Sequence, residues 1–455
     1  MGAQTHVLVI PFPAQGHVAP LMKLAHQIAD YGIKVTFVNT EFIHEKIVFA
    51  LPENNEKQMM KLVSIPDGLG PEDDRNNAFK LTESILRVMP GHLRALIENI
   101  NMLGKEEEIT CVIADLSFGW ALEVVGEMGI KQTGFCPFSP SALALSLQIP
   151  NLIEAGIIDE NGIPLENGLI RLSIDLPPWN SNELTWSCPG DLTTQKVFFN
   201  YTSSISQAAK LSNWILCNSS YEIDPSAFDL IPNVLPIGPL LASNVISHHA
   251  GSLWPEDSTC LSWLDTQPTG SVVYVAFRSF TIFSKKQVEE LALGLEKTGR
   301  PFLWVVMSEL SYGKIVEYPE GYVERVAKFG KIVEWAPQEK VLAHPSIACF
   351  LSHCGWNSTI EALTMGVPFL CWPYFADQFH NRNYICNVWK IGLRLDLGED
   401  GIILRNEIKD KIGRLLCDYG IRENSLKLKE TARNSISEIG SSKRNLECFI
   451  DQIKN

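Results

Sequence analysis

A strand, a helix and a second strand follow one another near the start of the chain, and this pattern constrains the fold more than any other feature. Residues 6–12 (HVLVIPF) and 33–39 (IKVTFVN) are short apolar runs typical of buried strands, and residues 18–30 have helical periodicity. The predicted helix carries apolar side chains on one face: Val18, Leu21, Leu24, Ala25 and Ile28. Two strands joined by a helix predict a βαβ unit and therefore a parallel sheet.

The same alternation continues through the first half of the chain. The predicted segments are a helix near 81–103, a strand at 109–115 (ITCVIAD), a helix near 117–128, a short strand near 131–135, a helix at 196–211 and a strand at 214–219. Residues 150–195 are rich in Pro, Asn and Trp, and we predict that they form a long irregular insertion.

A break in this pattern divides the chain in two. Residues 234–260 contain three Pro and two Gly with little periodicity, which is typical of a linker. The alternation then restarts with a predicted helix at 259–265, a strand at 271–277, a helix at 285–299 and a strand at 302–306. We therefore predict two doubly wound α/β domains. Their expected bounds are 1–240 for the N-terminal domain, 241–259 for the linker, 260–437 for the C-terminal domain and 438–455 for a last helical segment.

Residues 335–378 contain side chains that suit a nucleotide linked to a sugar. Trp335, at the end of a predicted strand over 331–335, offers a flat face for a base, and Gln338 supplies a nearby donor and acceptor. The pair Asp377 and Gln378 at the other end suits sugar hydroxyls.

A turn in the middle of this stretch leads from a strand into a helix, in the run FLSHCGWNSTIEAL. The turn brings His353, Asn357 and Ser358 to a helix N-terminus, where backbone N–H groups and the helix dipole favour an anion. The sequence therefore predicts a diphosphate site at this turn.

The 44 residues from Trp335 to Gln378 resemble, without a gap, the signature box of the plant family-1 UDP-dependent glycosyltransferases. The resemblance implies the GT-B fold, with two Rossmann-like domains facing across a cleft, the acceptor in the first and the donor in the second. It also implies that the last helix crosses back to the first domain. A final Gln in the box is associated with glucose donors, so we expect UDP-glucose as co-substrate.

The family's motif assigns a donor contact to each matching position. Trp335 would stack on uracil beside Gln338, Glu361 would bind ribose, and the middle turn would bind the diphosphate. The full donor-binding set expected is Ser279, Trp335, Ala336, Gln338, His353, Trp356, Asn357, Ser358, Glu361, Asp377 and Gln378. For Glu361 a second interpretation stays open, because Ser358-Thr-Ile-Glu361 also fits a capping box that would turn this side chain back onto the helix start.

His17 and Asp115 are the candidate catalytic pair. His17 lies in the predicted loop after the first strand, and Asp115 ends the strand ITCVIAD, so both lie where open α/β sheets bind ligands. A carboxylate beside an imidazole sets its tautomer and basicity. The segments PFPAQGHVAP and VIADLSFGW resemble family motifs that carry the base and its partner. Asp115 also fits a plain helix cap, and that alternative stays open.

One position departs from the family pattern. After the strand SVVYVAF the family continues Gly-Ser, but this chain has Arg278-Ser279. Glycine at such a turn serves close approach or positive φ. Arg278 either adds a phosphate contact or obstructs the donor, and obstruction is the preferred interpretation. Met307 stands where family members often carry Arg, with an effect that the sequence leaves open.

The acceptor pocket is expected to be broad and apolar, with its polar end at His17. Its candidate walls are Phe118, Trp120, Phe138, Trp179, Trp186, Phe198 and Tyr374. Ordinary core packing is the alternative for each of these rings. The expected acceptor is a small lipophilic metabolite such as a flavonoid, phenol or terpenoid.

The net charge of −14 disfavours nucleic acid and anionic membranes as partners. No apolar run approaches about 18 residues, so no transmembrane segment is expected. The start of the sequence does not resemble a signal peptide, and the eleven cysteines lack paired spacing. We therefore expect a cytoplasmic monomer with reduced thiols. The resemblance implies that no metal or further cofactor is needed.

Two other enzyme classes are disfavoured. G-x-G-x-x-G is missing after both first strands, which argues against an NAD-dependent dehydrogenase, and no G-x-S-x-G elbow indicates a serine hydrolase. The remaining alternative is a UDP-sugar or small-molecule binding protein whose turnover is impaired by Arg278. The presence of both His17 and Asp115 argues against it.

Overall fold

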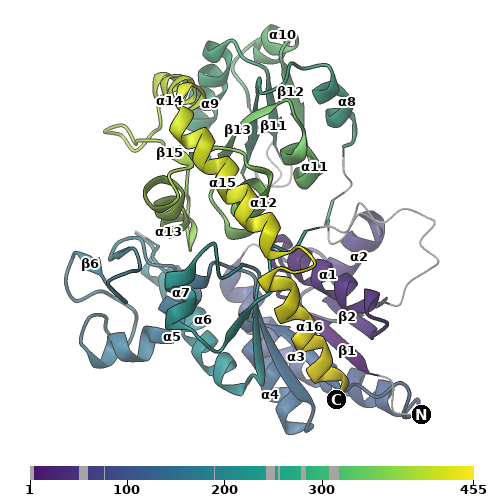
Figure 1. Cartoon of the computed structure of the whole chain (residues 1–455). Helices are drawn as coiled ribbons and strands as arrows, with labels where there is room; N and C mark the ends of the chain where they lie inside the picture. The colour runs from purple at the N-terminus through teal and green to yellow at the C-terminus, as the bar shows by residue number, and fades with distance from the viewer. Residues whose placement is uncertain are drawn as a thin grey trace. The chain divides into compact units, whose positions relative to one another are not determined.

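The structure is a computed structural model that describes residues 5–50, 60–75, 77–188, 190–241, 252–254, 257–277, 283–306 and 317–455. The chain divides into two compact units (Figure 1). Unit 1 comprises Met1–Pro255 with Asn434–Asn455, and unit 2 comprises Glu256–Arg433.

Unit 1 is built on a parallel sheet with the strand order β3-β2-β1-β4-β5-β8-β9. Its strands are β1 (His6–Ile10), β2 (Lys34–Thr40), β3 (Met60–Ile65), β4 (Cys111–Asp115), β5 (Lys131–Cys136), β8 (Trp214–Cys217) and β9 (Val234–Pro236). Its helices are α1 (Gln15–Asp30), α2 (Glu41–Ala50), α3 (Ala78–Asn101), α4 (Gly119–Glu127), α5 (Pro140–Glu154), α6 (Leu192–Leu211), α7 (Pro225–Leu230) and α16 (Ser441–Lys454).

Successive side chains of a strand point to opposite faces of this sheet, and helices cover both faces. Leu8 and Ile10 of β1 pack in one apolar cluster with α3 and α4. Val7 and Val9 pack in a second cluster with α1 and α16. The C-terminal helix α16, which runs beside the sheet in Figure 1, is therefore part of the core of unit 1.

Unit 2 repeats the design with a parallel sheet in the order β12-β11-β10-β13-β14-β15. Its strands are β10 (Val272–Ala276), β11 (Phe302–Val305), β12 (Gly330–Val333), β13 (Ile347–Ser352), β14 (Phe369–Cys371) and β15 (Gly392–Arg394). Its helices are α8 (Thr259–Asp265), α9 (Lys285–Thr298), α10 (Tyr322–Val326), α11 (Gln338–Ala343), α12 (Trp356–Met365), α13 (Gln378–Asn383), the π-helical turn η3 (Tyr384–Val388), α14 (Arg405–Cys417) and α15 (Tyr419–Ser435).

Each sheet reverses its strand order at one point, and such switch points are where doubly wound folds bind ligands. In unit 1 the reversal lies between β1 and β4, and in unit 2 between β10 and β13. The segments that leave the carboxyl ends of these four strands are therefore the positions to examine for a site. They include His17, Asp115 and the turn that begins at His353.

Several elements of unit 1 differ from the sequence predictions: α2, β3, α5 and β9 were not predicted, and α1 begins earlier than expected. His17 was placed in a loop, but α1 already begins at Gln15, since the N–H groups of His17 and Val18 both donate to the Ala14 carbonyl at 2.9 Å. Helix α5 was not predicted, because it is buried around most of its circumference and so lacks a clear apolar stripe. The insertion that follows contains a small antiparallel pair, β6 (Leu169–Ile170) and β7 (Trp179–Asn180).

Candidate active site

His17 and Asp115 meet at the switch point of unit 1. The Nδ1 atom of His17 lies 2.7 Å from Oδ2 of Asp115. Asp115 is fully buried, whereas the His17 side chain is 26% exposed. With Nδ1 donating its proton to the carboxylate, the lone pair lies on Nε2. This geometry is compatible with the predicted role of a general base.

Asp115 also fulfils the capping role that the sequence left open. Its Oδ1 atom accepts a hydrogen bond of 2.9 Å from the Ser117 N–H and so caps the 3-10 turn η1 (Leu116–Phe118). One carboxylate oxygen holds the turn and the other holds the imidazole. The two interpretations of Asp115 are therefore compatible, because each uses a different oxygen.

An aromatic wall surrounds the dyad. The Phe12 ring lies 5.1 Å from the His17 ring, 5.4 Å from Phe118 and 5.5 Å from Tyr201. Phe118 in turn lies 5.1 Å from Trp120. Burial, with a further contribution from the Asp115 charge, raises the pKa of Tyr201 well above its usual value, so this phenol stays neutral. The sequence analysis did not select Phe12 or Tyr201, although Phe12 stands in the same short segment as His17.

The remaining predicted acceptor residues fall into separate places. Trp179 and Trp186 are buried in a cluster formed by α5 and the insertion, and the Trp186 Nε1–H donates to the Gly162 carbonyl at 2.8 Å. Phe138 and Phe198 are partly buried against that cluster, and Phe138 also contacts the cluster around β4. Tyr374 belongs to unit 2 and is 45% exposed. The structure thus groups Phe118 and Trp120 with the dyad and places the two buried tryptophans in the insertion core.

In unit 2 the predicted diphosphate turn links β13 to α12. Cys354 has a left-handed φ of 65°, and Gly355 occupies the N-cap of α12. A Cβ atom at Gly355 would lie 2.4 Å from Nε2 of His353, so the His353 ring can take this position only beside a glycine. The buried side chains of His353, Asn357 and Ser358 consequently gather at the helix N-terminus, where the dipole favours an anion.

A polar network extends from this helix to Gln338. The Gln338 Nε2 group donates to Oε2 of Glu361 at 2.7 Å and to Oγ of Ser358 at 2.9 Å. The Tyr274 hydroxyl approaches Oε1 of Gln338 at 3.5 Å. The capping-box interpretation of Glu361 is wrong, because α12 begins at Trp356 with Gly355 as its N-cap, which places Ser358 inside the helix.

The end of the box forms a tight turn around Gln378. Its Oε1 atom accepts from the N–H groups of Tyr374 at 2.8 Å and Phe375 at 3.1 Å, and Ala376 has a φ of 57°. Asp377 is partly exposed at the N-terminus of α13. Because Oε1 is engaged by the backbone, Nε2 of Gln378 is fixed as a donor.

Three further donor-box residues, Trp335, Ala336 and Trp356, are buried or half-buried. Trp335 is half-buried two residues beyond the end of β12, and its carbonyl accepts from the Asp257 N–H at 3.2 Å. Ala336 is buried, as is Trp356, whose ring lies 6.4 Å from Trp389. The predictions for Arg278, Ser279 and Met307 fall outside the described residues.

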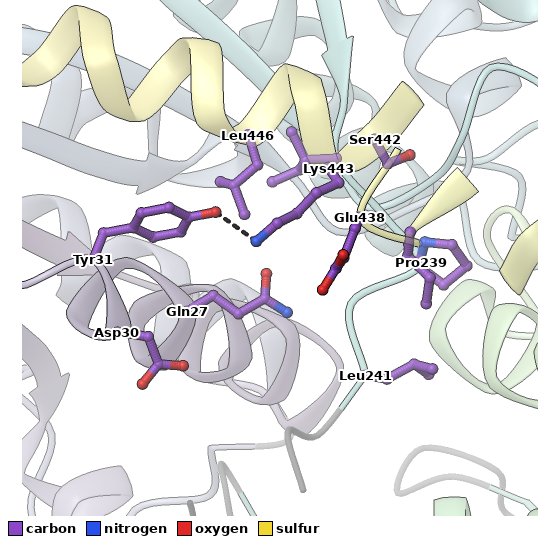
Figure 2. A pocket seen from close by; sticks show the side chains of 11 residues that line it. Gln27, Asp30, Tyr31, Pro239, Leu241, Glu438, Ser442, Lys443 and Leu446 are labelled. Carbon is purple, nitrogen blue, oxygen red and sulfur yellow. Dashed lines mark hydrogen bonds between the residues drawn. The ribbon is translucent and has the colours of Figure 1, made fainter. Parts of the chain in front are cut away.

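Unit 1 also contains a cavity of about 530 Å³ (Figure 2). It is lined by the end of α1, the segment after β9 and the start of α16, and the Lys443 ammonium there donates to the Tyr31 hydroxyl at 2.6 Å. Gln27, the first α1 residue in its wall, is ten positions along the helix from His17, or about 15 Å at the usual rise. This cavity is therefore separate from the dyad.

Among the described residues, no helix is long and apolar enough to cross a membrane. In the same part of the chain, no group of three or more His, Cys, Asp or Glu side chains is arranged to hold a metal ion.

Comparison with known proteins agrees with this geometry. Residues 195–430 match the family model of UDP-glucoronosyl and UDP-glucosyl transferase, and residues 3–61 match that of a glycosyltransferase N-terminal domain. The chain is 43% identical to UDP-glycosyltransferase 83A1 of Arabidopsis thaliana, over 99% of this chain and 97% of the relative. It is 32% identical to (R)-mandelonitrile beta-glucosyltransferase of Prunus dulcis, over 98% and 97% of the two chains.

Solved structures give the same assignment. The crystal structure of Os79 from O. sativa in complex with UDP superposes with a TM-score of 0.83 at 25% identity, covering 98% of this chain and 100% of the other. The fold is therefore GT-B, as the sequence predicted. From its two Rossmann-like units, its family-model matches and its full-length relatives, the chain belongs to the plant UDP-dependent glycosyltransferases and is a UDP-glycosyltransferase.

Proposed function

We propose that the chain transfers glucose from UDP-glucose, with inversion, to a hydroxyl or carboxyl group of a small lipophilic plant metabolite such as a flavonoid, phenol or terpenoid. The observation that carries this proposal is the 2.7 Å contact between His17 and the buried Asp115 at the switch point of unit 1. A neutral imidazole held in one tautomer is suited to removing a proton from an acceptor hydroxyl. The aromatic wall of Phe12, Phe118 and Tyr201 supports a lipophilic acceptor.

In the proposed reaction, Nε2 of His17 takes the acceptor proton while the acceptor oxygen attacks the anomeric carbon of glucose. The bond between that carbon and the β-phosphate oxygen breaks, and UDP leaves from the opposite face. Asp115 stabilises the imidazolium that forms. This single displacement gives a β-glucoside.

Unit 2 supplies the groups that the donor needs. The N-terminus of α12, with His353, Asn357 and Ser358, would take up the charge that develops on the leaving diphosphate. We therefore propose that the reaction uses no metal ion, and equal rates with and without a chelator would support this.

The base and both sugars of the donor have proposed contacts in the same unit. The network of Gln338 and Glu361 would receive uracil and ribose, with Trp335 stacked on the base. Asp377 and the Nε2 donor of Gln378 would hold the glucose hydroxyls. The name of the Prunus dulcis relative, a beta-glucosyltransferase, supports glucose as the sugar.

The test is incubation with UDP-glucose and a panel of flavonoid, phenolic and terpenoid acceptors, read by mass spectrometry beside His17→Ala. We expect a hexose mass gain that disappears in the variant while UDP binding, measured by calorimetry, persists. Binding of UDP without a mass gain on any acceptor would contradict the proposal. That result would favour the alternative of a binding protein impaired by Arg278, and Arg278→Gly would then be expected to restore turnover.

A further inference from the structure

Three cysteines of unit 2 meet at the donor box, two of them inside residues 335–378 and the third beyond its end. Cys371 is the last residue of β14, and Cys386 lies in the π-helical turn η3. Their sulfur atoms are 3.8 Å apart. Cys354, in the diphosphate turn, contacts the Cys371 thiol from another side. Cys354 and Cys371 are buried, whereas Cys386 is partly exposed.

Gly392 contributes to the close approach of Cys371 and Cys386. Strand β15 pairs with β14, and a Cβ atom at Gly392 would lie 2.6 Å from the Phe369 carbonyl and 2.7 Å from Cγ2 of Ile385. The missing side chain lets η3 pack closely against β15, the strand beside β14. The Ile391 N–H then donates to the Ile385 carbonyl at 2.9 Å and fixes the turn that carries Cys386. π-helical turns of this kind occur frequently at functional sites.

The pKa values of the Cys371 and Cys386 thiols are shifted in opposite directions. Burial raises the pKa of Cys371 well above its usual value. The Cys371 thiol, followed by the positive charges of Arg382, Arg394 and Lys411, lowers the pKa of Cys386 despite its partial burial. Asp396 offsets some of this charge, because it pairs with Lys411 at 2.8 Å and with Arg394 at 3.1 Å. The thiolate is the reactive form of cysteine, so Cys386 has the properties of the attacking thiol and Cys371 those of its resolving partner.

We propose that Cys386 and Cys371 form a dithiol that hydrogen peroxide oxidises to a disulfide. The Cys386 thiolate attacks one peroxide oxygen, the O–O bond breaks, and a sulfenic acid and hydroxide result. The Cys371 sulfur then attacks the Cys386 sulfur. The S–S bond forms, the S–O bond breaks, and the departing hydroxide takes up the Cys371 proton as water. In total, two thiols and one peroxide give one disulfide and two waters, with two electrons passing to the peroxide.

The position of Cys371 links this chemistry to the donor site. It directly precedes the segment 372–378, which carries Asp377 and Gln378. Closing the sulfur distance from 3.8 Å to a bond length of about 2.05 Å requires the two side chains, or β14 and η3 with them, to move. On the proposed function, we expect the disulfide to raise the KM for UDP-glucose several-fold; formation of the disulfide itself does not depend on that function.

The test compares four versions of the full chain: the wild type, Cys371→Ser, Cys386→Ser and, as a matched control, Cys417→Ser. Cys417 is an exposed thiol at the end of α14 in the same unit. Each reduced protein is treated with hydrogen peroxide with and without dimedone, which traps sulfenic acids. Free thiols are then blocked, and the protein is digested without reduction for mass spectrometry.

We expect a cross-link between the peptides of Cys371 and Cys386 in the wild type and in Cys417→Ser, but in neither of the other variants. In Cys371→Ser we expect dimedone to accumulate on Cys386, and at least about tenfold faster than on Cys417. Lack of the cross-link in folded wild-type protein, or a cross-link between Cys371 and Cys354 in its place, would overturn the proposal. Circular dichroism of each variant checks that it is folded.

Activity separates the two proposals. A cross-link in a protein that transfers no glucose would support the dithiol and contradict the proposed transferase reaction. Transfer without a cross-link would do the reverse. Where both are present, the KM for UDP-glucose is measured before oxidation, after oxidation and after reduction with dithiothreitol. A KM that rises and returns in the wild type, but stays constant in Cys386→Ser, supports the link between them; an unchanged KM contradicts it.

Discussion

The two candidate sites of this chain occupy equivalent places in similar sheets but are constructed differently. In unit 1 the proposed chemistry rests on two side chains, His17 and Asp115, that are 98 residues apart in sequence. In unit 2 most of the expected contacts come from one continuous stretch, 335–378, held by a polar network and by special backbone positions such as Cys354 and Ala376.

This difference follows from what each site has to do. A base needs one oriented ring, which a single buried carboxylate provides, and the remaining walls need only be apolar. A diphosphate and a sugar need many donors in fixed positions, and a strand–turn–helix segment supplies them from neighbouring residues. We therefore expect turnover to be sensitive to the loss of one side chain in unit 1. We expect UDP affinity to be sensitive to a change in the shape of the donor turn in unit 2.

The largest effect expected in unit 1 comes from Asp115→Asn. The amide oxygen keeps the hydrogen bond from the Ser117 N–H, so the NH2 group takes the place of Oδ2 and donates to Nδ1. The imidazole then loses both its tautomer and the negative partner of its charged form. We expect kcat to fall by about 10²- to 10⁴-fold, the range typical of an impaired general base. UDP affinity, measured by calorimetry, should stay unchanged. A joint loss of kcat and UDP binding would contradict the division of roles between the units.

The corresponding change in unit 2 is Gly355→Ala. The added Cβ would lie 2.4 Å from Nε2 of His353, so the His353 ring or the turn that carries it has to move. We expect UDP affinity to fall by about tenfold or more, equivalent to about 1.4 kcal/mol. The matched control is Gly413→Ala, because a Cβ at this α14 position meets no atom within 4 Å. Equal UDP affinity in the two variants would show that the backbone shape of the turn is not what holds the donor.

The same contrast explains what the sequence could predict. The βαβ order, the switch-point positions of His17 and Asp115 and the whole donor stretch are local patterns, and they could be read directly. Phe12 and Tyr201 could not, because Tyr201 comes from α6 and reaches the dyad only through the tertiary fold. Trp179 and Trp186 have the composition of a ligand wall but are buried in the insertion core. The capping pattern at Ser358 misled because the helix begins two residues earlier, at Trp356.

The buried side chain of His380 in unit 2 should make the stability of the protein depend on pH. Burial lowers the pKa of His380 to about 3, so the folded state holds it neutral where the unfolded chain, with a pKa of about 6.5, binds a proton. Stability from this group is complete above pH 6.5 and is lost as pH falls toward 3. Between pH 7 and 5 the loss is about 2 kcal/mol. Denaturant unfolding of His380→Gln should show a smaller decrease over this range than the wild type, and an equal decrease would contradict the assignment.

The smallest effect expected is that of Tyr201→Phe, which sharpens the description of the acceptor wall. The variant keeps the ring that packs 5.5 Å from Phe12 and removes only the buried hydroxyl. If the wall acts through shape and apolarity, kcat/KM for a phenolic acceptor should change by no more than about fivefold, the equivalent of one net hydrogen bond of about 1 kcal/mol. Tyr201→Ala, which removes the ring, should reduce kcat/KM more.

Burial and the Asp115 charge hold the pKa of Tyr201 well above 10. The wild type and Tyr201→Phe should therefore give superimposable pH–rate profiles up to pH 10. An alkaline limb in the wild type that disappears in Tyr201→Phe would instead make the phenol a titrating partner of the dyad.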